Sequence, residues 1–194
     1  MVPSDLNDIW GWVDSAGNEY AIVGTNDGTS IFDLSDPANP YEALFVPGMN
    51  SIWRDVKTFG NYAYVTTEAY NGLLIIDLSN LPDSTNTNTY IYSGPSNNPW
   101  LRAHNIYIDD RGYAYIFGAN RGLGGAIILD LNQDPTQPVE IADINNWQVH
   151  DGMVKGDTLF LAHAGNSLFS IWDVSNPSTP VLIAQNPTVG YYSH

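Results

Sequence analysis

An internal repeat with a period of 43 to 53 residues constrains this chain more than any other feature of its sequence. Four segments share an apolar run, an aspartate, an apolar residue, a short polar residue and a turn that contains proline. They read TSIFDLSDPANP, LLIIDLSNLPDS, AIILDLNQDPTQP and FSIWDVSNPSTP, with their aspartates at Asp33, Asp77, Asp130 and Asp173. A fixed period of about 40 to 50 residues is typical of propellers and other repeat arrays.

A second set of markers recurs in step with the aspartates. The markers are IWGWV, IWRDV, AHNIYI, VHDGMV and a final YSH, with key positions at Trp10, Trp53, His104, His150 and His194. Each of the first four is followed by a turn and a strand-like run, namely EYAIVG, NYAYVTT, GYAYIFG and TLFLAH. A strand, a tight turn, a second strand, a polar loop, a third strand ending in Asp and a Pro-containing turn into a fourth strand make one propeller blade.

The composition of these runs indicates strands. They are short, rich in Ile, Val, Tyr, Phe and Thr, and bounded by Gly, Pro, Asn and Asp. In NYAYVTT and GYAYIFG the tyrosines alternate with Ala and Val or Ile, so the two kinds of residue lie on opposite faces of a strand. We therefore expect the tyrosines to pack between blades. The repeated aspartates and the serines after them are expected to hold turns by bonding backbone N–H groups.

The predicted fold class is all-β, a β-propeller of four-stranded antiparallel blades. A sandwich would not repeat its sequence at this period, and a coil of a β-helix is shorter. Residues 1–194 form one region, with blades at approximately 8–48, 51–98, 102–146 and 148–187 and the start of a fifth copy at 189–194. We expect a fragment of a larger ring, whose exposed end blades lead the isolated chain to self-associate.

The charge balance excludes some classes of partner. Six Lys and Arg stand against 21 Asp and Glu, which gives a formal net charge of −15. This charge opposes approach to nucleic acid or anionic lipid. It suits a secreted or salt-exposed protein, or simply a solvated surface. The chain has no Cys, and no apolar run is long enough to cross a bilayer.

These motifs resemble the LVIVD-repeat proteins, and more closely the bacterial choice-of-anchor B proteins, which are exported propellers held at the cell surface. The resemblance rests on DIWGWVD, WRDV, HNI, the pair His150-Asp151, the closing VGYYSH and the four D-[LV]-[SN] turns. It implies an extracellular or surface-bound location and a continuation beyond His194. It implies no established reaction and supplies no catalytic residues.

Histidines at a shared repeat position give one specific hypothesis for chemistry. The first strand of each propeller blade lines the central channel, so His104, His150 and His194 would converge on the axis. Three imidazoles suit Zn²⁺ or a similar metal with one open position. Partners that fix their tautomers would be Asp55, Asn105 and Asp151. The alternative is that the histidines, like Trp10 and Trp53, fill the channel and bond to backbone.

Other polar residues carry weaker expectations. His163 is interpreted as a loop residue, and Arg54 and Arg102 as partners of nearby aspartates, with Arg54 beside Asp55 the plainest case. GLGG at 122–125 lacks the helix that a phosphate cradle needs. The acidic stretches DLNDIWGWVDSAGNE and NQDP lack the spacing of a calcium loop, which leaves only adventitious Ca²⁺ binding.

No G-x-S-x-G or H-E-x-x-H motif is present. Our first hypothesis for function is a surface or secreted binding module that recognises a carbohydrate, a peptide or a surface protein. Its candidate loops lie around Tyr70 and Asn71 and at residues 98–100, which end in Trp100. The second hypothesis is a metal-dependent hydrolase or lyase that uses the histidine ring. The third is a structural spacer without a ligand.

Overall fold

The computed structural model describes residues 5–188, and this part of the chain is built from sixteen β-strands. Two single 3₁₀ turns, at Ser84–Asn86 and Ala164–Asn166, are the other regular elements in it. No helix among these residues has the length and apolar character to span a membrane. The strands are β1 (Leu6–Val13), β2 (Glu19–Thr25), β3 (Gly28–Asp33), β4 (Tyr41–Pro47), β5 (Arg54–Phe59), β6 (Tyr62–Thr67), β7 (Leu73–Asp77), β8 (Thr89–Tyr92), β9 (Asn105–Ile108), β10 (Tyr113–Phe117), β11 (Ala126–Asp130), β12 (Val139–Ile144), β13 (Asp151–Lys155), β14 (Thr158–His163), β15 (Leu168–Asp173) and β16 (Val181–Pro187).

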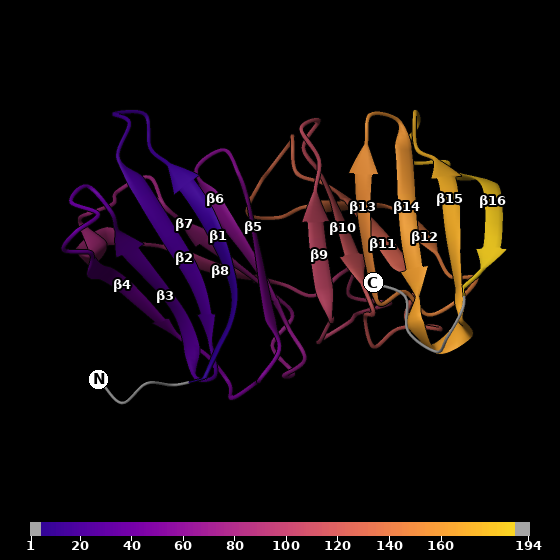
Figure 1. The fold of residues 1–194 in the computed structure, drawn as a ribbon, viewed down its shortest axis with the longest axis horizontal. Helices are drawn as coiled ribbons and strands as arrows, with labels where there is room; N and C mark the ends of the chain where they lie inside the picture. Colours follow the sequence, from indigo (N-terminus) through magenta and orange to yellow (C-terminus); the bar gives the residue numbers. More distant parts are fainter. Residues whose placement is uncertain (1–4, 189–194) are drawn as a thin grey trace.

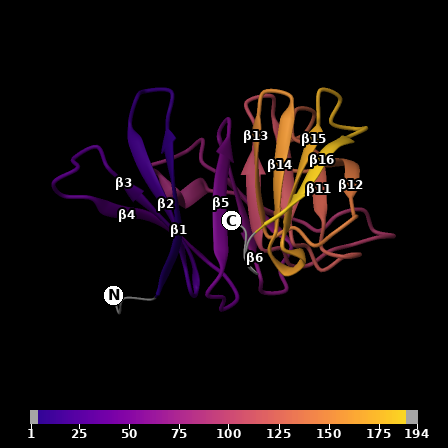
Figure 2. The same cartoon turned by 45° about the vertical axis from the view of Figure 1, so that its right-hand side comes forward.

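The strands form four separate sheets, each made of four strands that are consecutive in the chain. The order in every sheet follows the sequence, from β1 to β4, β5 to β8, β9 to β12 and β13 to β16, and all pairs are antiparallel. The sheets stand side by side as four blades, with the first and fourth at opposite ends of the array (Figures 1 and 2). The predicted fold class, a propeller of four-stranded antiparallel blades, is confirmed.

The hydrophobic core lies between neighbouring blades. One cluster joins blade 1 to blade 2, a second joins blade 2 to blade 3, and a third joins blade 3 to blade 4. On β6, Ala63 and Val65 pack toward blade 1, whereas Tyr64 packs toward blade 3. The Tyr64 hydroxyl donates to the carbonyl of Pro135 in blade 3 at 3.0 Å. Tyr64 and Tyr115 are fully buried, so the prediction that these tyrosines pack between blades is confirmed.

The four repeated aspartates hold the turns that follow their strands. Each carboxylate accepts a hydrogen bond from the backbone N–H two residues further on. The acceptor and donor residues, with their distances, are Asp33 and Ser35 (2.7 Å), Asp77 and Ser79 (3.0 Å), Asp130 and Asn132 (2.9 Å), and Asp173 and Ser175 (2.8 Å). Hydrogen bonds from Ser35 lower the pKa of Asp33, which keeps its carboxylate charged. The predicted structural role of these aspartates is confirmed.

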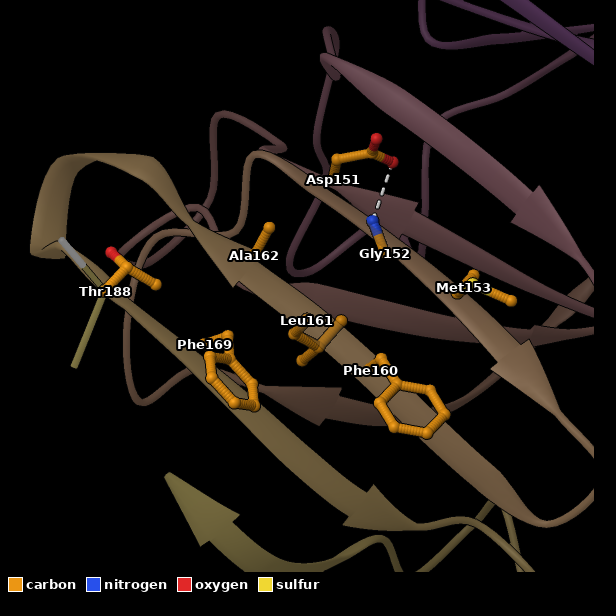
Figure 3. Close-up of a pocket in the computed structure, with 8 residues that line it drawn as sticks. All are labelled: Asp151, Gly152, Met153, Phe160, Leu161, Ala162, Phe169 and Thr188. Atoms are coloured by element: carbon orange, nitrogen blue, oxygen red, sulfur yellow. Dashed lines mark hydrogen bonds between the residues drawn. The ribbon is translucent and has the colours of Figure 1, made fainter. Parts of the chain in front are cut away.

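The outer face of blade 4 resembles the faces that are buried elsewhere between blades. Phe160 is the third residue of β14, as Tyr115 is of β10, yet Phe160 is 37% exposed and Tyr115 is 0% exposed. Phe160 and Phe169 line a hollow of about 470 Å³ on this face (Figure 3). At the other end of the array, Ile9 and Val13 of blade 1 are also exposed. Exposed apolar area of this kind favours association.

We expect the chain of residues 1–194 to self-associate through these outer faces. Replacing Met153 and Phe160 together by Lys places charges on the outer face of blade 4 and should move the protein toward monomer in sedimentation velocity runs across a concentration series. Leu123→Lys, at a 60% exposed loop residue, is the matched control and should leave association unchanged. A compact monomer at every concentration would contradict the prediction.

Candidate binding site at the loop face

A polar pocket of about 530 Å³ lies at the end of the sheets where β9 and β13 begin. Its wall is made by the segments that lead into the innermost strands of blades 2 to 4 and by the loops between the second and third strands of blades 2 and 3. The lining residues are Trp53, Glu68, Arg102, Ala103, His104, Gly118, Ala119, Asn120, Arg121, Gly122, Leu123, Gly124, Gln148, Val149 and His150. Three blades therefore build one concave site.

Three aromatic rings form a row along the pocket. The His104 ring lies between its neighbours, with ring centroids 5.7 Å from Trp53 and 4.3 Å from His150. The Nδ1 atom of His104 lies 2.7 Å from Oε1 of Glu68. This hydrogen bond fixes the orientation of the imidazole ring. Trp53 remains 48% exposed, so its ring offers a free apolar surface to a ligand.

The backbone holds both histidines firmly at the ends of their strands. The His104 N–H donates to the Phe117 carbonyl, and the His150 N–H donates to the Ala162 carbonyl, each at 2.9 Å. Gly118 has a left-handed φ of +64°, and a Cβ at this position would lie 2.9 Å from Cβ of His104. Only glycine fits both the conformation and the space. The local sequence of blade 3 therefore places His104 at the pocket wall.

Asn120 fixes the backbone of Arg102 from both sides. The Asn120 side-chain oxygen accepts from the N–H groups of Leu101 and Arg102 at 2.8 and 3.0 Å, and the Asn120 N–H donates to the Arg102 carbonyl at 3.1 Å. The Arg102 guanidinium lies over the ring of Tyr70, 5.2 Å from its centroid. Tyr70 is 57% exposed and does not itself line the pocket, but it contacts Arg102, which does.

Arg121, the second arginine of the pocket wall, is neutralised by neighbouring carboxylates. Its guanidinium donates to both oxygens of Glu140, at 2.6 and 2.9 Å, and to Asp143 at 3.0 Å. The side chain is only 7% exposed. A bidentate arginine–carboxylate pair is strong and directional. Arg121 therefore braces the glycine-rich loop at 118–125 against β12 and is committed within the protein.

The strand register corrects the alignment of the repeat markers. Trp10 faces Ile22 across the β1–β2 pair, and Lys57 faces Tyr64 across the β5–β6 pair, which places Trp10 at the position of Lys57. An irregularity between Leu6 and Ile9 shifts the register of β1. Trp10 and Trp53 therefore do not share the position of His104 and His150, as the sequence markers had indicated. The matching position in blade 2 is Arg54, and in blade 1 it falls at the irregularity between Leu6 and Ile9.

Two further sequence interpretations are wrong. Trp100, expected in a ligand-binding loop, is fully buried and packs edge-on against Tyr92. Arg54 does not pair with the adjacent Asp55, because its guanidinium is buried and donates to the carbonyls of Thr25 in blade 1 and of Met49 in the segment between β4 and β5, at 3.0 and 2.8 Å.

His163 is a buried strand residue and not a loop residue. It ends β14, with Nδ1 2.8 Å from the Gln148 carbonyl and Nε2 2.7 Å from the Ser170 hydroxyl. The Ser170 hydroxyl also accepts from the indole N–H of Trp172 at 2.7 Å. Burial lowers the pKa of His163, and a neutral ring satisfies both of its contacts. His163 thus supports the segment that leads to His150.

The predicted metal ligands are only partly within the described residues. His104 and His150 lie side by side, whereas His194 is outside residues 5–188. Within that range, no group of three or more His, Cys, Asp or Glu side chains is arranged to hold a metal ion. The three-histidine metal site remains a prediction.

The residues predicted as tautomer partners form a belt along the first strands of the four blades, together with Asp8. Asp8, Asp55, Asn105 and Asp151 occupy matching positions on β1, β5, β9 and β13. Asp8 accepts from the Val56 N–H and Asp55 accepts from the Ile106 N–H, each at 3.0 Å. The Asn105 amide donates to Asp151 at 3.1 Å. Each of these bonds joins one blade to the next. The repeated D-[IV], N-I and D-G pairs were the sequence signal for this belt.

The carboxyls of Asp8 and Asp55 share a buried site with the ammonium group of Lys57. The Lys57 Nζ atom lies 3.5 Å from Asp8 and 3.4 Å from Asp55. Burial, followed by the hydrogen bond to Asp8, raises the pKa of Asp55 to about 7. Burial also acts to raise the pKa of Asp8, but hydrogen bonds from Asp55 and Val56 hold it below its usual range. The two carboxyls therefore hold one proton at mildly acidic pH.

We expect Asp55→Asn to change the pH dependence of stability. The pKa of Asp55 is about 7 in the folded protein and about 4 in the unfolded chain. The protonated carboxyl therefore stabilises the wild-type fold fully below about pH 4, and this stabilisation is lost as the pH rises through about 7. An amide keeps the hydrogen bonds at every pH, as Asn105 does at the matching position. We measure the free energy of unfolding in urea at pH 5 and at pH 8. From pH 5 to pH 8, the difference between the variant and the wild type should shift in favour of the variant by about 1 kcal/mol or more. Parallel pH profiles for the two proteins would contradict this, and exposed Asp110→Asn is the control.

Comparison with solved structures shows the fold. A protein from Lactobacillus plantarum has a TM-score of 0.70 at 10% identity, over 97% of this chain and 57% of its own. A candidate 6-phosphogluconolactonase from Bacteroides fragilis has a TM-score of 0.62 at 12% identity, over 96% and 56%. The N-terminal domain of Nup159 has a TM-score of 0.56 at 13% identity, over 96% and 44%. The chain thus spans little more than half the length of the first two proteins.

Sequence comparison identifies the family. No curated protein sequence matches the chain significantly. The family model of the LVIVD repeat matches residues 15–46, 52–88 and 148–188, which together make up more than half of the chain. These matches fall on blades 1, 2 and 4, and blade 3 has the same strand order. The chain belongs to the family of LVIVD-repeat proteins.

Proposed function

We propose that this chain is an extracellular or cell-surface binding module of the choice-of-anchor B type, and that it binds saccharides in the pocket at the loop face. The observation that carries the proposal is the composition of this pocket. A half-exposed Trp53 ring stands beside polar side chains on a rigid frame built by three blades. Ligand sites combine an apolar surface with a few fixed polar groups in this way.

A saccharide fits this wall better than an apolar ligand does. The C–H face of a sugar ring can pack on the Trp53 indole, while hydroxyls can bond to groups such as Gln148 and Asn120 at the wall. The His104–Glu68 pair adds a fixed polar edge. Apolar ligands would leave these polar groups without water or a partner, which costs free energy.

The location rests on the resemblance and on the charge. The choice-of-anchor B proteins are exported, and a net charge of −15 suits a soluble protein outside the cell. Fractionation of the source cells with an antibody against the chain is expected to place it in the envelope or the medium. Recovery from the cytoplasm alone would contradict the location.

We expect the chain to bind oligosaccharides on a glycan array, and Trp53→Ala to weaken that binding about tenfold or more, because it removes the aromatic surface. The matched control is Tyr41→Ala, at an exposed aromatic residue on β4 that does not line the pocket. Binding of no saccharide by the wild-type chain would overturn the proposed function. If Trp53→Ala binds saccharides as tightly as the wild-type chain does, the binding site lies outside this pocket.

The second candidate function is a metal-dependent hydrolase or lyase. The adjacent rings of His104 and His150, 4.3 Å apart between centroids, favour it, with His194 as the third ligand predicted from the repeat. Zn²⁺ held by three imidazoles could activate a water molecule.

Elemental analysis and calorimetric titration with Zn²⁺ separate the two candidates. The hydrolase or lyase requires about one metal ion per chain, lost in the variant that carries both His104→Ala and His150→Ala. Circular dichroism of that variant checks that it is folded. No bound metal in the wild-type chain would eliminate this candidate and leave the binding module.

A further inference from the structure

We propose that the pocket selects saccharides that carry a carboxylate, and that Arg102 binds this carboxylate. The inference rests on the proposed function and names its ligand class. Hexuronic acid units are the simplest ligands of this chemistry.

The positive charges of the chain are few, and most are already used. Of six Lys and Arg residues, three form ion pairs with carboxylates and one is buried against carbonyls. These are Lys57, Arg111, Arg121 and Arg54. Among residues 5–188, Arg102 forms no ion pair within 4 Å, although the chain carries 21 acidic residues. The expectation that Arg102 pairs with a nearby aspartate is therefore wrong.

The structure holds Arg102 in a form suited to binding a carboxylate. Its backbone is fixed on both sides by Asn120, and its guanidinium lies over the Tyr70 ring at 5.2 Å. A ring under the flat face of a guanidinium leaves the N–H groups at its edge accessible, and the edge is the part that binds a carboxylate in bidentate fashion. Tyr70 thus orients the arginine without neutralising it.

The other charges at the wall leave this role to Arg102. Arg121 is paired with Glu140 and Asp143, and Glu68 is bonded to the His104 ring. A carboxylate that enters the pocket therefore meets Arg102 as the arginine of the wall that is in no ion pair within residues 5–188, while Glu68 presents a partly exposed carboxylate bonded to the His104 ring. The net charge of −15 repels anions at a distance, but at physiological salt this repulsion is screened beyond about 8 Å. A neutral sugar can accept hydrogen bonds from the arginine only through its hydroxyls, and these bonds are weaker than the charge-assisted bonds to a carboxylate.

The test compares two saccharide probes of equal length, tri-galacturonate and a neutral tri-galactoside, by calorimetry on the full chain in 0.15 M salt. We expect the acidic probe to bind at least about tenfold more tightly. Arg102→Gln should weaken binding of the acidic probe about 10- to 100-fold and weaken binding of the neutral probe far less. Lys155→Gln removes the same charge at the far end of β13 and should change neither affinity.

The outcomes separate this inference from the proposed function. Equal affinity for both probes, or an acidic-probe affinity that survives Arg102→Gln, overturns the inference and leaves a saccharide-binding module. Absence of binding by either probe and by the glycan array overturns both. If short poly-glutamate binds as tightly as tri-galacturonate and with the same dependence on Arg102, the carboxylate site stands and the assignment to saccharides is wrong.

Discussion

The packing of each sheet against the next is the interaction on which the rest of this structure depends. A four-stranded sheet has no core of its own, so a blade is stable only while it is packed against a neighbour. The faces differ, because small and branched residues such as Ala63 and Ile116 face the preceding blade, while Tyr64 and Tyr115 face the following one. The tyrosine-bearing face of one blade therefore packs against the face of small and branched residues on the next. This packing also brings the beginnings of β9 and β13 together, and the pocket lies where they meet.

The belt of acidic and amide side chains explains why one polar position recurs in every repeat. Asp8, Asp55, Asn105 and Asp151 hold neighbouring blades in register through hydrogen bonds between their first strands. A buried carboxylate is costly unless it is bonded, so this position tolerates only residues that serve the scaffold. The position just before it is free to vary, and it holds Asn7, Arg54, His104 and His150 in the four blades. The repeat therefore maintains the scaffold, and the pocket is built from residues that break the repeat.

The sequence predicted those parts of the molecule that depend on short-range patterns. The period predicted the blades, alternation predicted which face of each strand the tyrosines occupy, and Asp33 and its counterparts predicted the turns. Prediction from the sequence failed where a residue's position depends on how segments that are distant in the chain pack against each other. The irregularity in β1 shifted Trp10 out of the expected register. Trp100 follows a proline in a polar stretch, yet it fills a gap between blades 2 and 3. The approach of Glu68 to His104 depends on the angle between two blades, which no local pattern encodes.

The contrast between the acidic surface and the pocket limits what this site can bind. A long polyanion such as nucleic acid would meet repulsion along its whole length, and one arginine cannot offset it. A short acidic ligand meets that repulsion mainly during its approach, and near Arg102 the short-range attraction is stronger than the screened field of distant charges. Salt reduces the distant repulsion more than it weakens a close bidentate pair. The negative charge of the chain therefore disfavours binding of polyanions, while Arg102 still allows a small acidic group to bind.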